Sequence, residues 1–389
     1  MTLHGPRVLS LIACDLCQKE PVPPHAEHTG SGCDVWRTFQ PMAELRRRLY
    51  APFPNGEPGA AWSWKDSDTT IAVADLYDAV ILPRLSWADH RAGAQFIGAL
   101  HRAGKAVIFE VDDDLFSSEI NRRIRETVEP GTSLDDLERK RLDRLTALRL
   151  CDGVTVSTPR LATVMRSLTD APVVVVPNAI DDRWFTQVVR AAQRQVPGLT
   201  VGWAGGARPD DDLEAVFWAW GQLAQTHPAL TFVVAGHQPD ALARSVPDHR
   251  VRRLPWLPPE AYPLLLAEID IACCSVADQP FNRCKSVIKL WESTLAGSAV
   301  CASPTLYGQG IDDGVDGLLA ESPAEWLAQL TRLVESKDLR KTLRRNQRER
   351  IARRHTLAGT VARWPDAWSL IVSEFRSRRT APQLVLAGR

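Results

Sequence analysis

The sequence lacks an excess of charge of either sign, because its 47 Lys and Arg residues balance 47 Asp and Glu residues. It therefore lacks the overall positive field that is typical of proteins that bind nucleic acid. No run of about eighteen apolar residues is present, so no membrane-spanning helix is expected. The apolar run near the N-terminus is short and begins like a strand. We therefore expect no secretory signal and predict a soluble, cytoplasmic protein.

The sequence also lacks a second close pair of cysteines, which would complete a common zinc-binding pattern. Several of its 8 cysteines lie in apolar runs, where a reduced cysteine acts as a small hydrophobic residue. This favours a reducing compartment over a disulfide framework. One spacing still allows a zinc site, as an alternative to a strand end and a loop that carry these residues by chance. Its ligands would be Cys14, Cys17, His25, His28 and Cys33.

Apolar runs of strand length alternate with helical patterns along the 389 residues, which are enough for two domains. Continuous apolar strands separated by helices predict parallel sheets covered on both faces. The predicted strands are 8–13, 79–82, 106–111, 153–157, 173–176, 199–203, 230–235, 251–254, 269–273 and 299–302. The predicted helices are 40–48, 88–103, 134–150, 159–168, 211–226, 259–267, 285–296, 323–335 and 364–375, and residues 50–68 are expected to be irregular.

This order of elements predicts an α/β protein with two tandem Rossmann-like, doubly wound domains. We place the N-terminal domain at 1–185, the C-terminal domain at 186–362 and a final helix with a tail at 363–389. Ligands of such sheets bind beyond the carboxyl ends of the strands. A ligand cleft is therefore expected where the carboxyl ends of the two sheets face each other.

A phosphate site is predicted in the stretch 278–303, where a polar loop leads into a helix. Free N–H groups and the helix dipole attract anions to a helix N-terminus. Lys285 and the backbone at Ser286 and Val287 are the expected diphosphate ligands. Glu292 lies nearly two turns into the helix, where its carboxylate can accept hydrogen bonds from a ribose. Lys289, one turn on from Lys285, is consistent with a solvent-facing position instead.

A second phosphate-binding element is predicted after the first strand of the second half. Gly205 and Gly206 let the backbone approach a phosphate closely, and Arg208 supplies a fork of donors. An ordinary turn between a strand and a helix is the alternative interpretation. These residues and the helix of the preceding paragraph together predict a site for a nucleoside diphosphate.

Three adjacent carboxylates, Asp112, Asp113 and Asp114, follow a strand of the first half. They repel one another unless a positive or catalytic group balances them. A Mg²⁺ site, a catalytic carboxylate and an acidic helix N-terminus are the three interpretations, and the last fits Asp114 best. A Gly-rich loop at 30–37 either closes over a ligand or is a flexible connection.

A basic run at 337–355 has nine Lys or Arg residues against two acidic ones. We interpret it as a solvated amphipathic helix with Leu339, Leu343 and Ile351 facing inward. Contact with nucleic acid is the alternative, although the run has no aromatic residue that could stack on bases.

The chain resembles GT-B-fold glycosyltransferases, most closely the retaining family 4 type. The segments that carry the resemblance are 175–181 (VVPNAID), 202–205 (GWAG), 282–297 with Ser303, and 314–319 (GVDGLL). They span nearly all of the C-terminal half in the order of that family. The N-terminal half matches only through the VDDDLF turn and the Gly-rich loop.

The resemblance implies a nucleotide-sugar donor, with a UDP-sugar favoured, bound mainly by the C-terminal domain without an obligatory metal. Arg208 and Lys285 would neutralise the diphosphate, and Glu292 matches the second glutamate of the family's E-x7-E motif. The first glutamate of that motif is replaced by Cys284. The resemblance also implies that the last helix crosses back to the N-terminal domain. The residues expected to act in catalysis are Asp112, Asp113, Arg208 and Lys285, and those expected to bind the donor are Gly205, Gly206, Trp256, Asn282, Ser286, Val287 and Glu292.

The acceptor is not encoded in any recognisable motif. A glycan, a lipid-linked glycan or a small molecule with a hydroxyl group is the main expectation. Hydroxymethylated bases of phage-like DNA are a distinct alternative, because the VDDDLF turn also resembles transferases that modify such bases. A non-catalytic protein that binds sugar nucleotides is the alternative of another class, and the loss of the first glutamate at Cys284 motivates it.

Overall fold

The computed structural model describes residues 6–12, 37–38, 40–48, 59–63, 71–72, 74–84, 90–121, 131–206, 210–258 and 261–380. The chain divides into two compact units. The first comprises Met1–Asp112, Arg139–Pro177 and Val361–Arg389, and the second comprises Asp113–Glu138 and Asn178–Thr360. Each unit is built around one parallel sheet.

The sheet of the first unit has the strand order β2-β1-β3-β4-β5-β6, and all of its neighbouring strands are parallel. Strands β3, β4 and β5 are buried along their whole length, as expected for a parallel sheet covered on both faces. The strands are β1 (Val8–Ile12), β2 (Gly59–Ser63), β3 (Ala79–Pro83), β4 (Ala106–Val111), β5 (Gly153–Val156) and β6 (Val173–Val175).

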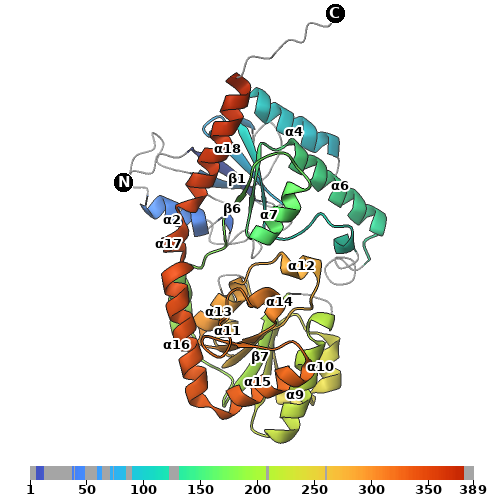
Figure 1. The fold of residues 1–389 in the computed structure, drawn as a ribbon, viewed down its shortest axis with the longest axis vertical. Helices are drawn as coiled ribbons and strands as arrows, with labels where there is room; N and C mark the ends of the chain where they lie inside the picture. The colour runs from blue at the N-terminus through green and yellow to red at the C-terminus, as the bar shows by residue number, and fades with distance from the viewer. Residues whose placement is uncertain are drawn as a thin grey trace, which may run out of the picture. The chain divides into compact units, whose positions relative to one another are not determined.

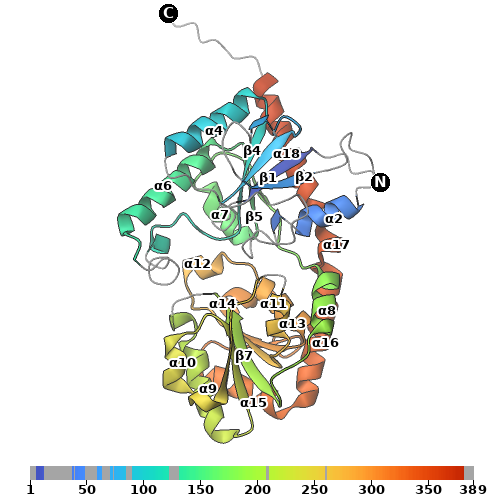
Figure 2. The same ribbon diagram turned by 180° about the vertical axis from the view of Figure 1, so that it is seen from behind.

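The helices of the first unit include one from the very end of the described chain. Helix α18 runs along the first sheet (Figures 1 and 2), where Ile371 fills the space beside Gly153 on β5. Arg376 on the same helix pairs with Asp78 at a distance of 2.7 Å. The helices near this sheet are α2 (Gln40–Arg48), α4 (His90–Arg102), α6 (Leu134–Leu150), α7 (Pro159–Arg166) and α18 (Arg363–Thr380).

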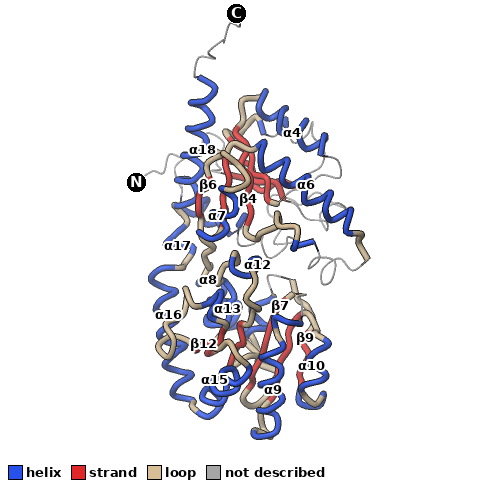
Figure 3. The backbone as a smooth tube through the Cα atoms, turned by 45° about the vertical axis from the view of Figure 1, so that its right-hand side comes forward, coloured by secondary structure: helices blue, strands red, loops and turns tan. Residues whose placement is uncertain are grey.

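The sheet of the second unit has the order β12-β11-β10-β7-β8-β9 and is also parallel throughout. Its strands are drawn in red in Figure 3, where β7, β9 and β12 are labelled. The strand order reverses direction at β7, where the chain crosses from one side of the sheet to the other. Doubly wound sheets bind ligands at such a point. The strands are β7 (Thr200–Gly205), β8 (Thr231–Gly236), β9 (Val251–Leu254), β10 (Ile271–Cys274), β11 (Ala299–Ala302) and β12 (Leu318–Leu319).

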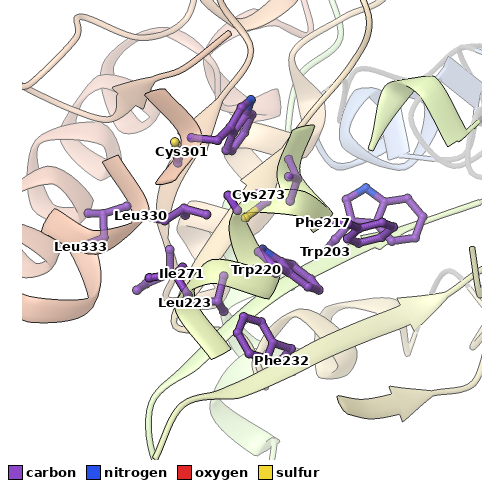
Figure 4. Packing of buried hydrophobic residues seen from close by; sticks show 14 of the residues in the cluster. Trp203, Phe217, Trp220, Leu223, Phe232, Ile271, Cys273, Cys301, Leu330 and Leu333 are labelled. Carbon is purple, nitrogen blue, oxygen red and sulfur yellow. The ribbon is translucent and has the colours of Figure 1, made fainter. Parts of the chain in front are cut away.

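The core of the second unit is rich in aromatic side chains. Trp203, Phe217, Trp220 and Phe232 are almost fully buried and pack together with leucines of the covering helices (Figure 4). Burying one such side chain contributes about 1.5–3 kcal/mol. The helices of this unit are α8 (Asp182–Ala191), α9 (Glu214–Thr226), α10 (Asp240–Ser245), α11 (Tyr262–Leu266), α12 (Pro280–Arg283), α13 (Ile288–Ala296), α14 (Pro304–Tyr307), α15 (Pro323–Glu335), α16 (Lys337–Arg354) and α17 (Leu357–Thr360).

Several elements differ from the sequence-based expectations. Strand β2 lies inside the segment 50–68 that we expected to be irregular, and it pairs with β1. Helix α8 was not predicted, although Asp181 caps it by accepting from the Trp184 N–H. The predicted helix 285–296 begins later, at Ile288, and the preceding polar loop contains the short helix α12. The prediction of an α/β fold with two parallel sheets is confirmed.

Candidate functional site

Two glycines and an exposed tryptophan lie together at the carboxyl edge of the second sheet. Strand β7 ends at Gly205 and β8 ends at Gly236, which has a φ of +89°. A Cβ at Gly236 would lie 2.5 Å from the Gly205 carbonyl oxygen, so only glycine fits there. The indole of Trp256, which follows β9, is 61% exposed and borders both Gly206 and Gly236. This edge therefore offers a flat aromatic surface beside bare backbone.

Helix α13 presents an uncapped N-terminus. Its N-cap residue is Val287, and among the described residues no side chain caps the helix there. Ser286, just before it, accepts a hydrogen bond of 2.8 Å from the Asn178 amide. Further along the helix, Trp291 stacks on His355 with ring centres 4.4 Å apart, which fixes the helix in the unit. Uncapped N–H groups with the positive end of the helix dipole favour an anion.

Glu292 is buried on α13 with a relative exposure of 4%. Within the part of the chain that the structure describes, no group donates a hydrogen bond to its carboxylate. Burial raises the pKa of Glu292 to about 7, and the positive charge of Lys289 opposes that rise. A buried carboxyl without a donor is costly unless a ligand supplies one. The carboxyl therefore has the properties of a ligand-binding group.

Lys289 is the residue whose role the sequence left open, and the solvent-facing alternative is wrong. Its Nζ donates a hydrogen bond of 2.7 Å to the Ala204 carbonyl on β7 and lies 5.5 Å from the ring centre of Trp203. A Cβ at Gly205 would overlap this ammonium group. The spacing of three residues from Glu292 was the available sign, because residues three apart share one face of a helix.

Asn282 is fully buried, and its amide is used within the protein. The side-chain N–H groups donate to the Asp212 carboxylate at 2.8 Å and to the Ala277 carbonyl at 3.0 Å. Asp212 also accepts from the Ala277 N–H at 2.7 Å. These bonds fasten α12 to the loop after β7. The contact of Asn282 with a donor remains a prediction, and its observed contacts position the surrounding loops.

Lys285 pairs with Asp113 at 3.6 Å, and both residues belong to the second unit. The Lys285 ammonium also lies 4.5 Å from the ring centre of Phe281. Cys284, which stands at the position of the first motif glutamate, is buried with a relative exposure of 2%. The fold thus brings together two of the predicted site residues, Lys285 and Asp113, and their catalytic roles stay predictions.

The three consecutive aspartates have three different environments. Asp112 lies 3.8 Å from the guanidinium of Arg84, in the first unit. Asp114 is buried and accepts hydrogen bonds from the N–H groups of Phe116 at 3.1 Å and Ser117 at 3.3 Å. Asp114 therefore caps a turn, in keeping with the structural interpretation. Only Asp112 and Asp113 keep carboxylates that face cationic side chains.

A buried ion pair lies next to the acidic turn of the first unit. Glu110 on β4 accepts a hydrogen bond of 2.5 Å from Arg37 Nε and another from the Thr155 hydroxyl. Arg37 also donates to the Val176 carbonyl and lies 4.5 Å from the ring centre of Trp364. Burial raises the pKa of Glu110, while Arg37 and Thr155 oppose that rise. The Arg37 end of the predicted Gly-rich loop is therefore held in the core.

The basic run 337–355 forms α16, and several of its arginines have structural partners. Arg340 donates to the Leu333 and Val334 carbonyls at the end of α15, and Arg344 donates to the Gly297 carbonyl at 2.8 Å. Arg348 donates to the Thr294 and Leu295 carbonyls at the end of α13. Leu343 and Ile351 are buried. These buried side chains, together with Leu339 packed against the core, confirm the amphipathic interpretation. The predicted solvated face differs, because these arginines donate to carbonyls of helix ends.

Some predicted site residues lie outside the described residues. These are Arg208, residues 30–36 of the Gly-rich loop, and the zinc candidates Cys14, Cys17, His25, His28 and Cys33. Within the described ranges, no group of three or more His, Cys, Asp or Glu side chains is arranged to hold a metal ion. In the same ranges, no helix combines the length and apolar character needed to span a membrane.

Comparison with known proteins identifies the fold. Residues 218–366 match the family model described as glycosyl transferase-like. HepE from Anabaena, solved in complex with UDP, superimposes with a TM-score of 0.61 at 15% identity, over 94% of this chain and 100% of that chain. TarM from S. aureus gives a TM-score of 0.53 at 13% identity, over 75% of this chain and 56% of that chain.

An E. coli protein described as trehalose-6-phosphate, bound with UDP-2-fluoro glucose, gives a TM-score of 0.52 at 11% identity, over 95% of this chain and 99% of that chain. No curated protein matches the chain by sequence. Residues 218–366 therefore resemble a glycosyl transferase-like domain, in agreement with the predicted family, and the chain shares its fold with these solved structures.

Proposed function

We propose that the protein is a retaining glycosyltransferase that moves a sugar from a UDP-sugar to a hydroxyl group of its acceptor. The observation that carries this proposal is Glu292. Its side chain is buried on α13, which follows β10 of the second sheet, yet no described residue donates a hydrogen bond to it. A ribose supplies two hydroxyl donors, which would satisfy such a carboxylate.

The neighbouring groups suit the other parts of a nucleotide. The uncapped N–H groups at Ser286 and Val287 would bind the diphosphate, with Lys285 and Arg208 neutralising its charge. The exposed indole of Trp256 would stack on the base beside Gly205 and Gly206. HepE from Anabaena, which shares the fold, was solved with UDP and with UDP-glucose. These facts support a uridine nucleotide over other bases.

The reaction would proceed with retention of configuration. The bond between the sugar C1 and the β-phosphate oxygen breaks, which leaves an oxocarbenium-like centre and a nucleoside diphosphate. The acceptor hydroxyl forms the new bond to C1 from the same face, and its proton passes to the departing phosphate. Stabilisation of that phosphate by Lys285 and Arg208 would be the largest contribution. Asp113, which belongs to the same unit as Lys285, would steady the positive centre.

The test is a donor screen. Purified protein is mixed with UDP-, GDP-, ADP- and TDP-sugars, and thermal shift and released nucleoside diphosphate are measured. We expect saturable stabilisation by a UDP-sugar, slow release of UDP, and loss of release by orders of magnitude in Lys285→Ala. Stabilisation without release, also in the presence of an acceptor panel that includes hydroxymethylated DNA, would favour a non-catalytic binder. No response to any donor would overturn the proposal.

A further inference from the structure

Lys289 stands where a diphosphate would have to lie if Glu292 binds the ribose. In a nucleotide the ribose and the diphosphate are directly linked. Lys289 precedes Glu292 by three residues, which is about 4.5 Å along the axis of α13 towards its uncapped N-terminus. A ribose at Glu292 therefore directs the diphosphate towards Lys289 and the free N–H groups. This step rests on the proposed function.

The ammonium of Lys289 is fixed in place by the strand that ends at the site. It donates to the Ala204 carbonyl at 2.7 Å and lies over the ring of Trp203, which is 2% exposed. The absence of a side chain at Gly205 gives it room. A cation that is already held by a buried strand loses little side-chain freedom when an anion binds. The site is thus built to hold positive charge at the end of β7.

The segment after β7 does not supply a lysine of its own. Beyond Arg208 the chain continues with Asp210, Asp211 and Asp212, and the carboxylate of Asp212 is occupied by Asn282 and Ala277. Acidic residues at this turn would repel a diphosphate. Helix α13 places a further cation, Lys289, at the end of β7.

Lys285, the lysine that the sequence favoured, has a different position. It precedes α13 and pairs with Asp113 at 3.6 Å. Lys289 instead contacts the strand that ends in the glycine pair. The two lysines therefore face different neighbours, and a binding experiment can separate their contributions.

We propose that Lys289 is a direct ligand of the donor diphosphate, in addition to the cations named in the proposed function. It binds the diphosphate while the nucleoside is held by Glu292 and Trp256. Lys289 thus distinguishes UDP from ligands with fewer phosphates, and Glu292 recognises the ribose.

The experiment compares uridine, UMP and UDP by isothermal titration calorimetry with the full chain. We expect Lys289→Met to weaken UDP binding by about tenfold to a hundredfold, because a charged hydrogen bond to phosphate is lost. Uridine binding should stay within about twofold of the wild type, since uridine has no phosphate. Glu292→Gln should weaken all three ligands by a similar factor. Lys341→Met, on the exposed side of α16, controls for the loss of one charge.

Each outcome decides between the roles. Equal weakening of uridine and UDP by Lys289→Met would assign the lysine a structural role and overturn the inference, and unchanged UDP binding would overturn it as well. If Lys289→Met is too unstable to study, Lys289→Gln replaces it, because a glutamine can still donate to a carbonyl. Recovery of UDP affinity in Lys289→Arg would support a role for the positive charge. Failure of the wild type to bind any uridine nucleotide would overturn the proposed function itself. Binding of UDP that does not depend on Lys289 would overturn only the inference about this lysine.

Discussion

Glu110 of the first unit and Glu292 of the second unit are both buried, but only Glu110 accepts hydrogen bonds from described residues. Glu110 in the first unit is 2% exposed and Glu292 in the second is 4% exposed. Burial raises the pKa of both. Glu110 accepts hydrogen bonds from Arg37 and Thr155, whereas no described residue donates one to Glu292.

This difference separates a structural carboxylate from one available to a ligand. A buried charge that is paired and hydrogen-bonded belongs to the fold, and breaking its network costs stability. A buried carboxyl without donors lowers stability and persists where function requires it. Glu110 therefore holds β4, β5 and the segment at Arg37 together, while Glu292 is kept open for a ligand.

The largest expected effect on stability comes from breaking the hydrogen bond between Arg37 and Glu110. Arg37→Met would leave the carboxyl of Glu110 buried without its cation, at a cost of about 3–5 kcal/mol in the free energy of unfolding. Urea denaturation at neutral pH measures this loss. The double variant Arg37→Met/Glu110→Met should recover most of it, because neither buried charge remains. A loss below about 1 kcal/mol in the single variant would show that Glu110 does not depend on Arg37.

The next largest effect is expected at Glu292, where a substitution should raise the free energy of unfolding instead of lowering it. The pKa of this carboxyl is about 7 in the folded protein and 4.5 in the unfolded chain. The folded state thus binds more protons between these values, so the carboxyl lowers stability progressively as pH rises from 4.5 to 7 and remains unfavourable above 7. Glu292→Gln should therefore be more stable than the wild type at pH 8, by about 2–3 kcal/mol, and nearly equal to it at about pH 4.5.

Urea denaturation of both proteins at these two pH values checks this prediction. Glu292→Gln that is less stable than the wild type at pH 8 would mean that the carboxylate has a stabilising partner. In that case the contrast with Glu110 would disappear.

A smaller effect concerns the pH dependence of nucleoside binding. Ribose hydroxyls donate to the ionised carboxylate, and Glu292 ionises as pH rises through about 7. Uridine affinity should therefore rise about tenfold between pH 6 and pH 8. The same titration with Glu292→Gln should give a flat profile. A wild-type profile that is also flat over this range would contradict the assigned role.

The smallest effect tests the basic helix. Arg344→Met should lose about 1 kcal/mol of stability, because the Gly297 carbonyl at the end of α13 loses a charged donor. Arg345→Met is the matched control on the exposed face of α16 and should change stability by less than about 0.5 kcal/mol. Equal effects of the two variants would show that the arginine cap does not stabilise α13.

The elements with strong local patterns were predictable from the sequence. Strands β4, β9 and β11 and helices α2, α6 and α15 have the predicted boundaries, because apolar runs and helical periodicity are local properties. Strand β2 was missed because its Gly-, Ala- and Trp-containing segment has no such pattern, and it is defined by its pairing with β1. The prediction placed the start of helix α13 too early, because the polar loop before it contains helical turns of its own.

The elements that carry the candidate site residues were predictable from the sequence, whereas the contacts of those residues were not. Glu292 was correctly placed on a helix, but its lack of donors depends on the surrounding packing. Lys289 was not separated from a surface lysine, because its partner on β7 lies 85 residues away along the chain. The structural role of Arg37 in the core likewise depends on Glu110, 73 residues away. Such long-range pairings are not visible in local spacing.

The most direct measurement compares uridine with 2′,3′-dideoxyuridine in the wild type and in Glu292→Gln by calorimetry at pH 8. If Glu292 binds the ribose, the wild type should prefer uridine by about tenfold or more, because hydroxyl hydrogen bonds to a buried carboxylate are lost in the dideoxy compound. Glu292→Gln should show little preference. Equal affinity of the wild type for the two nucleosides would contradict the assignment of Glu292 as the open, ribose-binding carboxylate.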